Sequence, residues 1–138
     1  MTSNRITLIS LSVADIARSR AFYETLGWVP EAVLENGVFY AMAGQKMMLY
    51  RREKLAKDLG RAPETLGTGA MTLAQNFPTT QETDAAYAAA ISAGATGLSV
   101  PQKVFWGGYS GVYADPDGHL WEVAMNPFWE LDDRGLLA

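Results

Sequence analysis

The chain has 138 residues, of which 49% are hydrophobic, and its formal net charge is −4 at pH 7. This length suits one domain or two small halves that share a core. The negative charge and the absence of a Lys/Arg run argue against a nucleic-acid-binding surface. The chain has no cysteine, which excludes disulfides and thiolate metal sites, and it has neither a secretory leader nor an apolar run of about 18 residues. We therefore expect a cytoplasmic protein that binds neither nucleic acid nor membrane.

The first predicted elements are a strand and a helix. Residues 6–13 are rich in β-branched and aliphatic side chains, as is typical of a strand. Asp15 is the predicted N-cap of the helix, and Gly27 is its predicted end. Between them, apolar side chains recur at roughly helical spacing. They are Ile16, Phe22, Tyr23 and Leu26.

Three more strands complete the first half of the chain. They are predicted at residues 28–33, 38–43 and 46–51, with turns at 35–37 and 44–45. The first half therefore has the order β-α-β-β-β. Segment 53–69 then predicts a linker, because a short charged helix at 53–59 is followed by several Gly and Pro residues.

The same order restarts in the second half. Residues 70–76 predict a strand, Thr79 and Glu82 form a capping box, and the Ala-rich helix that follows ends at Gly94. Further strands are predicted near residues 97–100, 111–114 and 119–125. Each half has only one helix to cover its sheet, so pairing two such modules buries a face that a single module leaves wet.

The last predicted strand carries an acidic residue, Glu122. The sequence Asp-Pro-Asp-Gly at 115–118 is typical of a tight turn that leads into this strand. Since side chains alternate along a strand, Glu122 shares a face with Leu120 and Ala124, away from the bulky Trp121. An acid in that position lines a cavity or an interface.

Two segments carry a family resemblance. Residues 13–23, VADIARSRAFY, followed by Leu26-Gly27-Trp28, resemble the first strand-helix signature of the vicinal oxygen chelate superfamily, which includes glyoxalase I, bleomycin-resistance proteins and extradiol dioxygenases. Residues 113–123, YADPDGHLWEV, resemble its last hairpin. The similarity covers about residues 5–127.

The resemblance implies an α+β fold of two paired β-α-β-β-β modules whose sheets curl around a shared cleft. The expected parts are module one at about 5–52, a linker at 53–69, module two at about 70–127 and a C-terminal tail at 128–138. The family often pairs its modules across a homodimer, and a homodimer is expected here as well.

In metal-dependent members, the resemblance implies a divalent ion bound by side chains from the first and last strands of each module. The matching positions are Leu8, Met47 or Met48, Ala70 and Glu122. Only Glu122 is a donor, and a Zn²⁺, Ni²⁺ or Fe²⁺ site needs about three or four donors. The single histidine, His119, lies three residues from Glu122, on the opposite strand face, and we expect it to be a solvated turn residue. The sequence therefore predicts no metal ion and no cofactor.

A small organic ligand is the partner that the predicted inward face favours. That face is mostly small and apolar, so it suits a molecule held by shape plus one or two polar contacts. The candidate ligand-binding residues are Leu8, Ser10, Ser12, Met47, Leu49, Ala70, Thr72, Ala74, Trp106 and Glu122.

Several of these candidates have a structural alternative. Trp106 lies beside three glycines and forms either a flat wall for a ligand or part of the core of a glycine-rich hairpin. Met47, with Met42 and Met48, forms either an adaptable pocket floor or ordinary packing. Glu122 either contacts the ligand or is a structural acid that is hydrogen-bonded to neighbouring hydroxyls.

Three functional hypotheses follow. The first is a small-molecule-binding protein with a degenerate metal site, in which Trp106 and the aliphatic strand face bind an aromatic or planar ligand. The second is a glyoxalase-, dioxygenase- or isomerase-type enzyme that uses Glu122 as a catalytic base or metal ligand. In the third, the cleft is vestigial and the module binds a partner through Phe128 and Trp129 of the tail, although these rings also suit packing within the chain or on a second copy.

Overall fold

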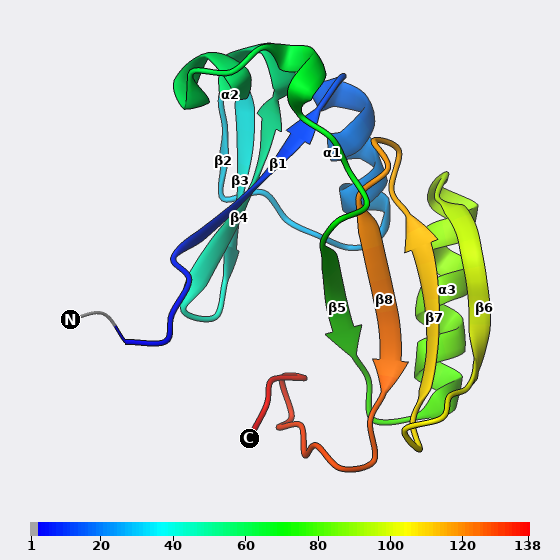
Figure 1. Ribbon diagram of the computed structural model, residues 1–138. Coiled ribbons are helices and arrows are strands. Elements are labelled where there is room, and N and C mark those ends of the chain that lie inside the picture. The colour runs from blue at the N-terminus through cyan, green and yellow to red at the C-terminus, as the bar shows by residue number, and fades with distance from the viewer. Residues whose placement is uncertain (1–2) are drawn as a thin grey trace. The chain divides into compact units, whose positions relative to one another are not determined.

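The computed structural model describes residues 3–138 and contains two compact units (Figure 1). Unit 1 ends at Gly67 and unit 2 begins at Thr68. Each unit contains one four-stranded mixed sheet and has the element order β-α-β-β-β. The predicted α+β class and the repeated module are therefore confirmed.

Unit 1 has the strand order β1-β4-β3-β2, in which β1 is parallel to β4 and the other pairs are antiparallel. Its elements are β1 (Leu8–Val13), α1 (Ile16–Thr25), β2 (Ala32–Val33), β3 (Gly37–Met42), β4 (Gln45–Arg51), α2 (Arg52–Leu59) and the 3₁₀ helix η1 (Pro63–Thr65). The strand predicted at 28–33 is thus much shorter than expected.

Helix α1 begins and ends where the sequence predicts. The carboxylate of Asp15 accepts a hydrogen bond from the backbone N–H of Arg18 at 3.1 Å. Gly27 follows the helix with φ of 100°, a conformation that favours glycine. The helix buries Phe22 and Tyr23 against the sheet, where the rings of Tyr23 and Tyr40 lie 6.3 Å apart. These contacts cover one face of the unit 1 sheet.

Unit 2 has the strand order β5-β8-β7-β6, and here too the first strand is parallel to the last. Its elements are β5 (Thr72–Asn76), α3 (Thr80–Ala93), β6 (Thr96–Lys103), β7 (Tyr109–Ala114) and β8 (Leu120–Met125). The predicted capping residue is confirmed, because the backbone N–H of Glu82 donates to Thr79 Oγ1 at 3.1 Å. Helix α3 is followed by Gly94, with φ of 116°.

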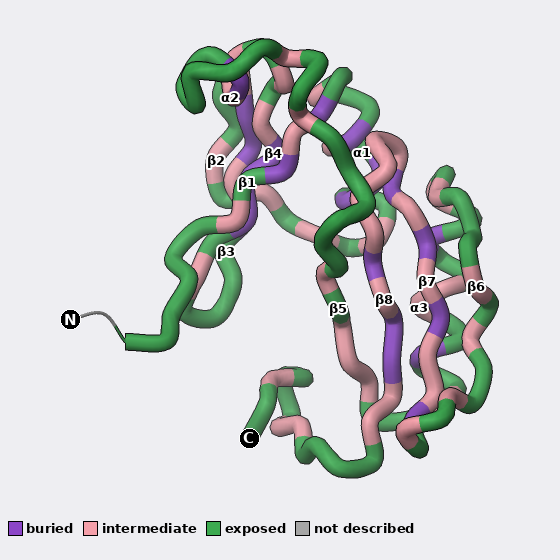
Figure 2. Tube along the Cα trace, viewed as in Figure 1, coloured by how far each residue is buried: buried purple, intermediate pink, exposed green. Residues whose placement is uncertain are grey.

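Helix α3 packs on one face of the unit 2 sheet. Tyr113, Trp121 and Val123 are buried on that face, and Tyr109 Oη donates to Asp84 Oδ1 of α3 at 2.6 Å. Figure 2 shows buried residues on the strands of both units. None of the helices within residues 3–138 combines the length and apolar character needed to cross a membrane.

Gly111 of β7 leads to a prediction about stability. A Cβ atom at this position would lie 2.8 Å from the backbone atoms Ser99 O and Pro101 N of β6. Because these are backbone atoms at an irregular part of the strand pair, they cannot move without disturbing the sheet. We expect Gly111→Ala to lower the free energy of unfolding by about 1–3 kcal/mol in chemical denaturation.

Gly67→Ala is the matched control for this substitution. No heavy atom lies within 4 Å of the position of its Cβ, and its φ is outside the left-handed region. Its free energy of unfolding should change by no more than about 0.5 kcal/mol. Equal stabilities of the two variants would contradict the close approach at Gly111.

Candidate functional site

The sheet of unit 1 has one face that packs on α1 and one face that does not, here called the open face of unit 1. The strand registers define this open face. Its residues are Leu8, Ser10 and Ser12 of β1, Gly37, Phe39 and Ala41 of β3, and Lys46, Met48 and Tyr50 of β4. The open face of unit 2 is defined in the same way, as the face opposite to α3. It carries Thr72, Ala74 and Asn76 of β5, Ser110, Val112 and Ala114 of β7, and Leu120, Glu122 and Ala124 of β8.

The prediction that Leu49 shares a face with Leu8 is wrong. In the parallel pair of β1 and β4, Leu49 is opposite Leu11, and Met47 is opposite Ile9. Leu49 and Met47 are fully buried on the face that packs on α1. The methionine that lies on the open face is Met48.

The strand predicted to begin at Ala70 begins two residues later, at Thr72. Ala70 therefore lies in an exposed bend before β5 rather than within the strand. The prediction that Thr72 and Ala74 share a face with Glu122 is confirmed by the register, because Ala74 is opposite Glu122 and Thr72 is opposite Leu120. Thr72, Ala74 and Glu122 thus share one face.

Glu122 is half-buried in the middle of β8, between Ala74 of β5 and Val112 of β7. The turn before this strand is held by Asp115, a buried residue whose Oδ1 accepts the backbone N–H groups of Asp117 and His119, each at 2.9 Å. His119 thus belongs to the turn, as predicted. The turn and the register together direct Glu122 to the open face of unit 2.

Ser10 and Ser12 lie on the open face of unit 1, whereas Glu122 lies on that of unit 2. Their association with Glu122 stays a prediction. Within unit 1, Ser10 is opposite Met48 and Ser12 is opposite Tyr50.

Trp106 lies in the turn between β6 and β7, where it is half-buried. Its ring lies over Gly108, so closely that any side chain at position 108 would overlap it. Phe105, the residue before Trp106, is 100% exposed. The contact with Gly108 supports the interpretation in which Trp106 packs on its own hairpin, and its contact with a ligand stays a prediction.

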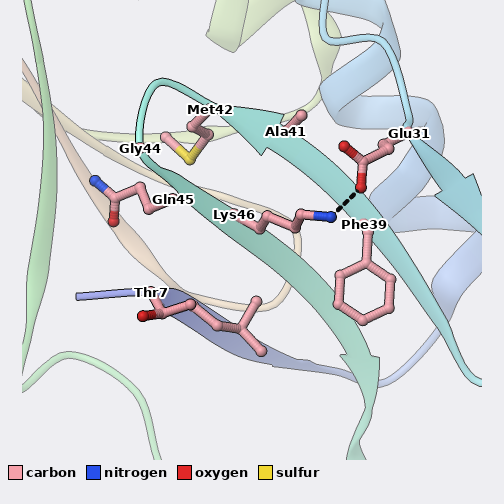
Figure 3. A pocket seen from close by; sticks show the side chains of 9 residues that line it. Thr7, Glu31, Phe39, Ala41, Met42, Gly44, Gln45 and Lys46 are labelled. Atoms are coloured by element: carbon pink, nitrogen blue, oxygen red, sulfur yellow. Dashed lines mark hydrogen bonds and ion pairs between the residues drawn. The ribbon is translucent and has the colours of Figure 1, made fainter.

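A cavity of about 440 Å³ lies in unit 1, at the end of the open face where the β3–β4 turn is found. Figure 3 shows its lining. The nine lining residues are Thr7, Leu8, Glu31, Phe39, Ala41, Met42, Gly44, Gln45 and Lys46. Among them, Leu8 was a candidate ligand-binding residue, and Met42 was named in the sequence analysis as part of an adaptable pocket floor or of ordinary packing. The polar residues Lys46 and Tyr50, four apart on one face of β4, were the sequence signal for this face. The apolar run Met47-Met48-Leu49 between them interrupts the alternation.

The lining of this cavity contains one cation and one anion, which pair with each other. Lys46 Nζ donates to Glu31 Oε1. The two side chains are 50% and 40% exposed, respectively. A pair that is open to water contributes little to stability, about 0–1 kcal/mol.

The opposite end of the open face of unit 1 carries a second polar group. Tyr50 donates to Asp58 of α2, and Lys54 Nζ donates to the same carboxylate at 3.2 Å. The hydrogen bond to Asp58 raises the pKa of the Tyr50 hydroxyl. The hydrogen bonds from Tyr50 and then Lys54 lower the pKa of the Asp58 carboxyl. The open face of unit 1 is therefore polar at both ends, with Phe39 and Met48 between them.

The side chains at the positions matched to metal ligands do not provide a site for a divalent metal ion. Across residues 3–138, no three His, Cys, Asp or Glu side chains lie close enough together to bind one. Leu8, Met48 and Ala70 have no oxygen or nitrogen in their side chains, and a second copy of the chain would bring the same residues. Glu122 therefore stands without the two or three further donors that a transition-metal site requires.

The family profile of the Glyoxalase/Bleomycin resistance protein/Dioxygenase superfamily matches residues 5–123. The chain belongs to this superfamily. The resemblance found in the sequence is thereby confirmed. Among curated proteins, the comparison finds no match to this chain.

Solved structures of other superfamily proteins share this fold. A glyoxalase-related enzyme from Fulvimarina pelagi is 31% identical with a TM-score of 0.91, over 99% of this chain and 98% of that one. A family enzyme from Burkholderia phytofirmans is 18% identical with a TM-score of 0.76, over 86% of this chain and 96% of that one. Lactoylglutathione lyase from Agrobacterium tumefaciens is 19% identical with a TM-score of 0.72, over 95% of this chain and 100% of that one. The last two likenesses concern the fold alone.

The Tyr50–Asp58 hydrogen bond leads to a prediction about the pKa of the Asp58 carboxyl when Tyr50 is replaced. Because the pKa of Asp58 is lowered in the folded protein, its stabilising effect is present above the unfolded pKa of about 3.9 and is lost as the pH falls through the folded value. We expect Tyr50→Phe to raise the pKa of Asp58 toward that unfolded value. NMR titration of the Asp58 carboxyl carbon measures it.

Tyr109→Phe is the control, because it removes the hydrogen bond from Tyr109 to Asp84 in unit 2 and should leave Asp58 unchanged. An Asp58 pKa that is the same in Tyr50→Phe and in the unmodified protein would contradict the role given to Tyr50.

Proposed function

We propose that this protein binds a small organic molecule and that its metal site is degenerate, as in the antibiotic-sequestering branch of the superfamily. The observation that carries the proposal is the cavity of about 440 Å³ on the open face of unit 1. Ligand sites in proteins commonly have volumes of about 300–1,000 Å³ and mostly apolar walls with a few polar groups. Leu8, Phe39, Ala41 and Met42 supply such walls here.

The lack of metal-coordinating side chains supports a ligand that is bound through its shape rather than through a metal ion. Three of the four positions at which metal-dependent relatives carry ligands hold aliphatic or thioether side chains. Leu8 lines the cavity directly, so the substitution that removes a donor also enlarges the apolar wall. A planar or aromatic molecule suits such a wall, because flat rings bury much area for little loss of conformational entropy.

The open face of unit 2 carries further candidate contacts. Glu122 would accept a hydrogen bond from a ligand, with Thr72 as a second polar group and Ala74 as a small neighbour that leaves room. Ser10 and Ser12 are candidate polar contacts on unit 1, and Trp106 is a candidate ring contact on unit 2. Glu122 is half-buried on a face that no helix of its unit covers, which supports a role in recognition.

The proposal includes a cytoplasmic homodimer. The absence of cysteine is typical of a reducing compartment. Phe128 and Trp129 of the tail are 73% and 56% exposed, which suits burial against a second copy. The charges support it too: residues 1–67 carry nine Lys/Arg and seven Asp/Glu, whereas residues 68–138 carry two and eight. This uneven distribution of charge suits electrostatic attraction between two copies of the chain.

A thermal-shift screen that compares metals with planar organic molecules tests the proposal. A ligand at about 100 times its dissociation constant adds roughly 2.7 kcal/mol to the free energy of unfolding. We expect planar organic compounds to raise the melting temperature and Zn²⁺, Ni²⁺, Mn²⁺ and Fe²⁺ to leave it unchanged. Stoichiometric metal in the purified protein, or a rise in melting temperature with metals alone, would contradict the proposal that the metal site is degenerate.

A second candidate function is an enzyme of the glyoxalase, dioxygenase or isomerase type that uses Glu122 as a base. Two observations favour it. The protein from Fulvimarina pelagi, at 31% identity, is described as a glyoxalase-related enzyme, and Glu122 occupies the one family ligand position that still carries a donor.

Glu122→Gln separates the two candidates. The amide keeps the shape of the carboxylate but cannot accept a proton at neutral pH. In a catalyst, turnover should fall by about 10²-fold or more while ligand affinity stays within a few-fold. In a binding protein, affinity alone should change. Isothermal titration of a screened ligand, together with a search for its conversion by mass spectrometry, measures both quantities.

A further inference from the structure

The cavity of unit 1 contains a positive charge beside several apolar side chains. Lys46 is the one cation among the nine residues that line the cavity. On its own strand face, Lys46 is flanked by Leu8 of β1 and Ala41 of β3. Neither neighbour has a polar side chain. The strands β1 and β3 therefore give Lys46 no polar side chain as a direct neighbour on this face.

The position of Lys46 is determined by its backbone. The N–H of Lys46 donates to Thr7 O at 2.9 Å, and its strand pairs with β1 on one side and β3 on the other. The side chain therefore starts from a central strand, and Figure 3 shows its ammonium group pointing toward Glu31. Glu31 is itself held next to β3, because its N–H donates to Phe39 O at 2.7 Å.

The ammonium group keeps hydrogen-bonding capacity for a ligand. A lysine ammonium has three N–H donors, and the hydrogen bond to Glu31 uses one. Since half of the Lys46 side chain is exposed, a carboxylate can approach the remaining donors without displacing Glu31. Displacing Glu31 would also cost little, because an ion pair that is open to water is weak.

The surroundings favour an anion over a cation. Unit 1 carries nine Lys/Arg and seven Asp/Glu. Its net positive charge therefore adds to the attraction of an anion by Lys46 and opposes the repulsion of an anion by Glu31. The remaining lining includes the polar residues Thr7 and Gln45 and several apolar ones. Among the apolar residues, Leu8 and Met42 are partly exposed, and Phe39 offers a ring. These groups match a molecule with a flat apolar body and one anionic end.

We propose that the ligand of this cavity is a planar organic carboxylate, whose anionic group binds Lys46 and whose ring system packs on Leu8, Phe39 and Met42. This inference rests on the proposed function, since it names the ligand class of the same site. Lys46 is then the residue that determines specificity for charge, and Glu31 positions it and weakens the binding of anions.

The test uses three probes with one apolar body and different charges: naphthalene-2-carboxylate, naphthalene-2-carboxamide and 2-naphthylmethylamine. Their dissociation constants are measured by NMR titration of the full chain. We expect the carboxylate to bind at least about tenfold more tightly than the amide and the amine, the size of one charge-assisted hydrogen bond. The shifted resonances should include those of Lys46 and Phe39.

Substitutions at the ion pair should change this preference in opposite directions. Lys46→Gln should reduce the preference for the carboxylate to less than about twofold, and Lys46→Arg should retain it. Glu31→Gln should strengthen carboxylate binding, because it removes a nearby negative charge. Lys54→Gln, which breaks an ion pair of similar exposure outside the cavity, is the control and should change nothing. The three substituted residues are exposed, so all four variants should fold, and their melting temperatures verify this.

The outcomes separate this inference from the proposed function. If the amide or the amine binds as tightly as the carboxylate, or if Lys46→Gln keeps the preference, the anion site is overturned while small-molecule binding stands. If none of the three probes binds, the anion site is overturned as well, and the wider thermal-shift screen decides the proposed function independently.

Discussion

The parallel pairing of the first strand with the last strand in each unit is the constraint on which the rest of this structure depends. In unit 1 it sets Leu11 opposite Leu49, and in unit 2 it sets Ala74 opposite Glu122. Because side chains alternate along a strand, this one register assigns every residue of both strands to a face. The apolar set then packs on the helix of its unit, and the remaining set forms the open face. This division of residues between the two faces determines which strand side chains are available to a ligand site on either sheet.

An uncovered sheet face is costly unless something binds to it, and the residues on these faces are consistent with a ligand. In each unit one helix, α1 or α3, covers one side of the sheet. The other side keeps exposed apolar side chains such as Leu8, and in unit 1 helix α2 reaches it only at the Tyr50 end. In the metal-dependent relatives that the sequence resembles, this side carries coordinating side chains. At the positions that the resemblance matches to these side chains, unit 1 has Leu8 and Met48, which have no oxygen or nitrogen donor. The charged residues of the open faces are Lys46 in unit 1 and Glu122 in unit 2.

Much of the fold and part of the candidate site are predictable from local sequence. Asp15 and Thr79 mark helix starts because their side-chain oxygens accept backbone N–H groups. Glu122 is assigned correctly to a face because its strand alternates clearly and follows a turn of known chemistry. By contrast, the cavity with Lys46, Glu31 and Phe39 is not predictable in this way, because Glu31 reaches Lys46 from a different part of the chain.

The sequence by itself determined the two β-α-β-β-β modules, their superfamily and the scarcity of metal donors, since these depend on residue type and short-range spacing. Only the tertiary structure decided which methionine of β4 lies on the open face of unit 1 and where the cavity lies. The physical reason is that Met47-Met48-Leu49 is an uninterrupted apolar run with no alternation to reveal its faces. Its orientation is set by hydrogen bonds to β1 and β3, strands that lie elsewhere in the chain, and by the burial of Met47 and Leu49 beneath α1.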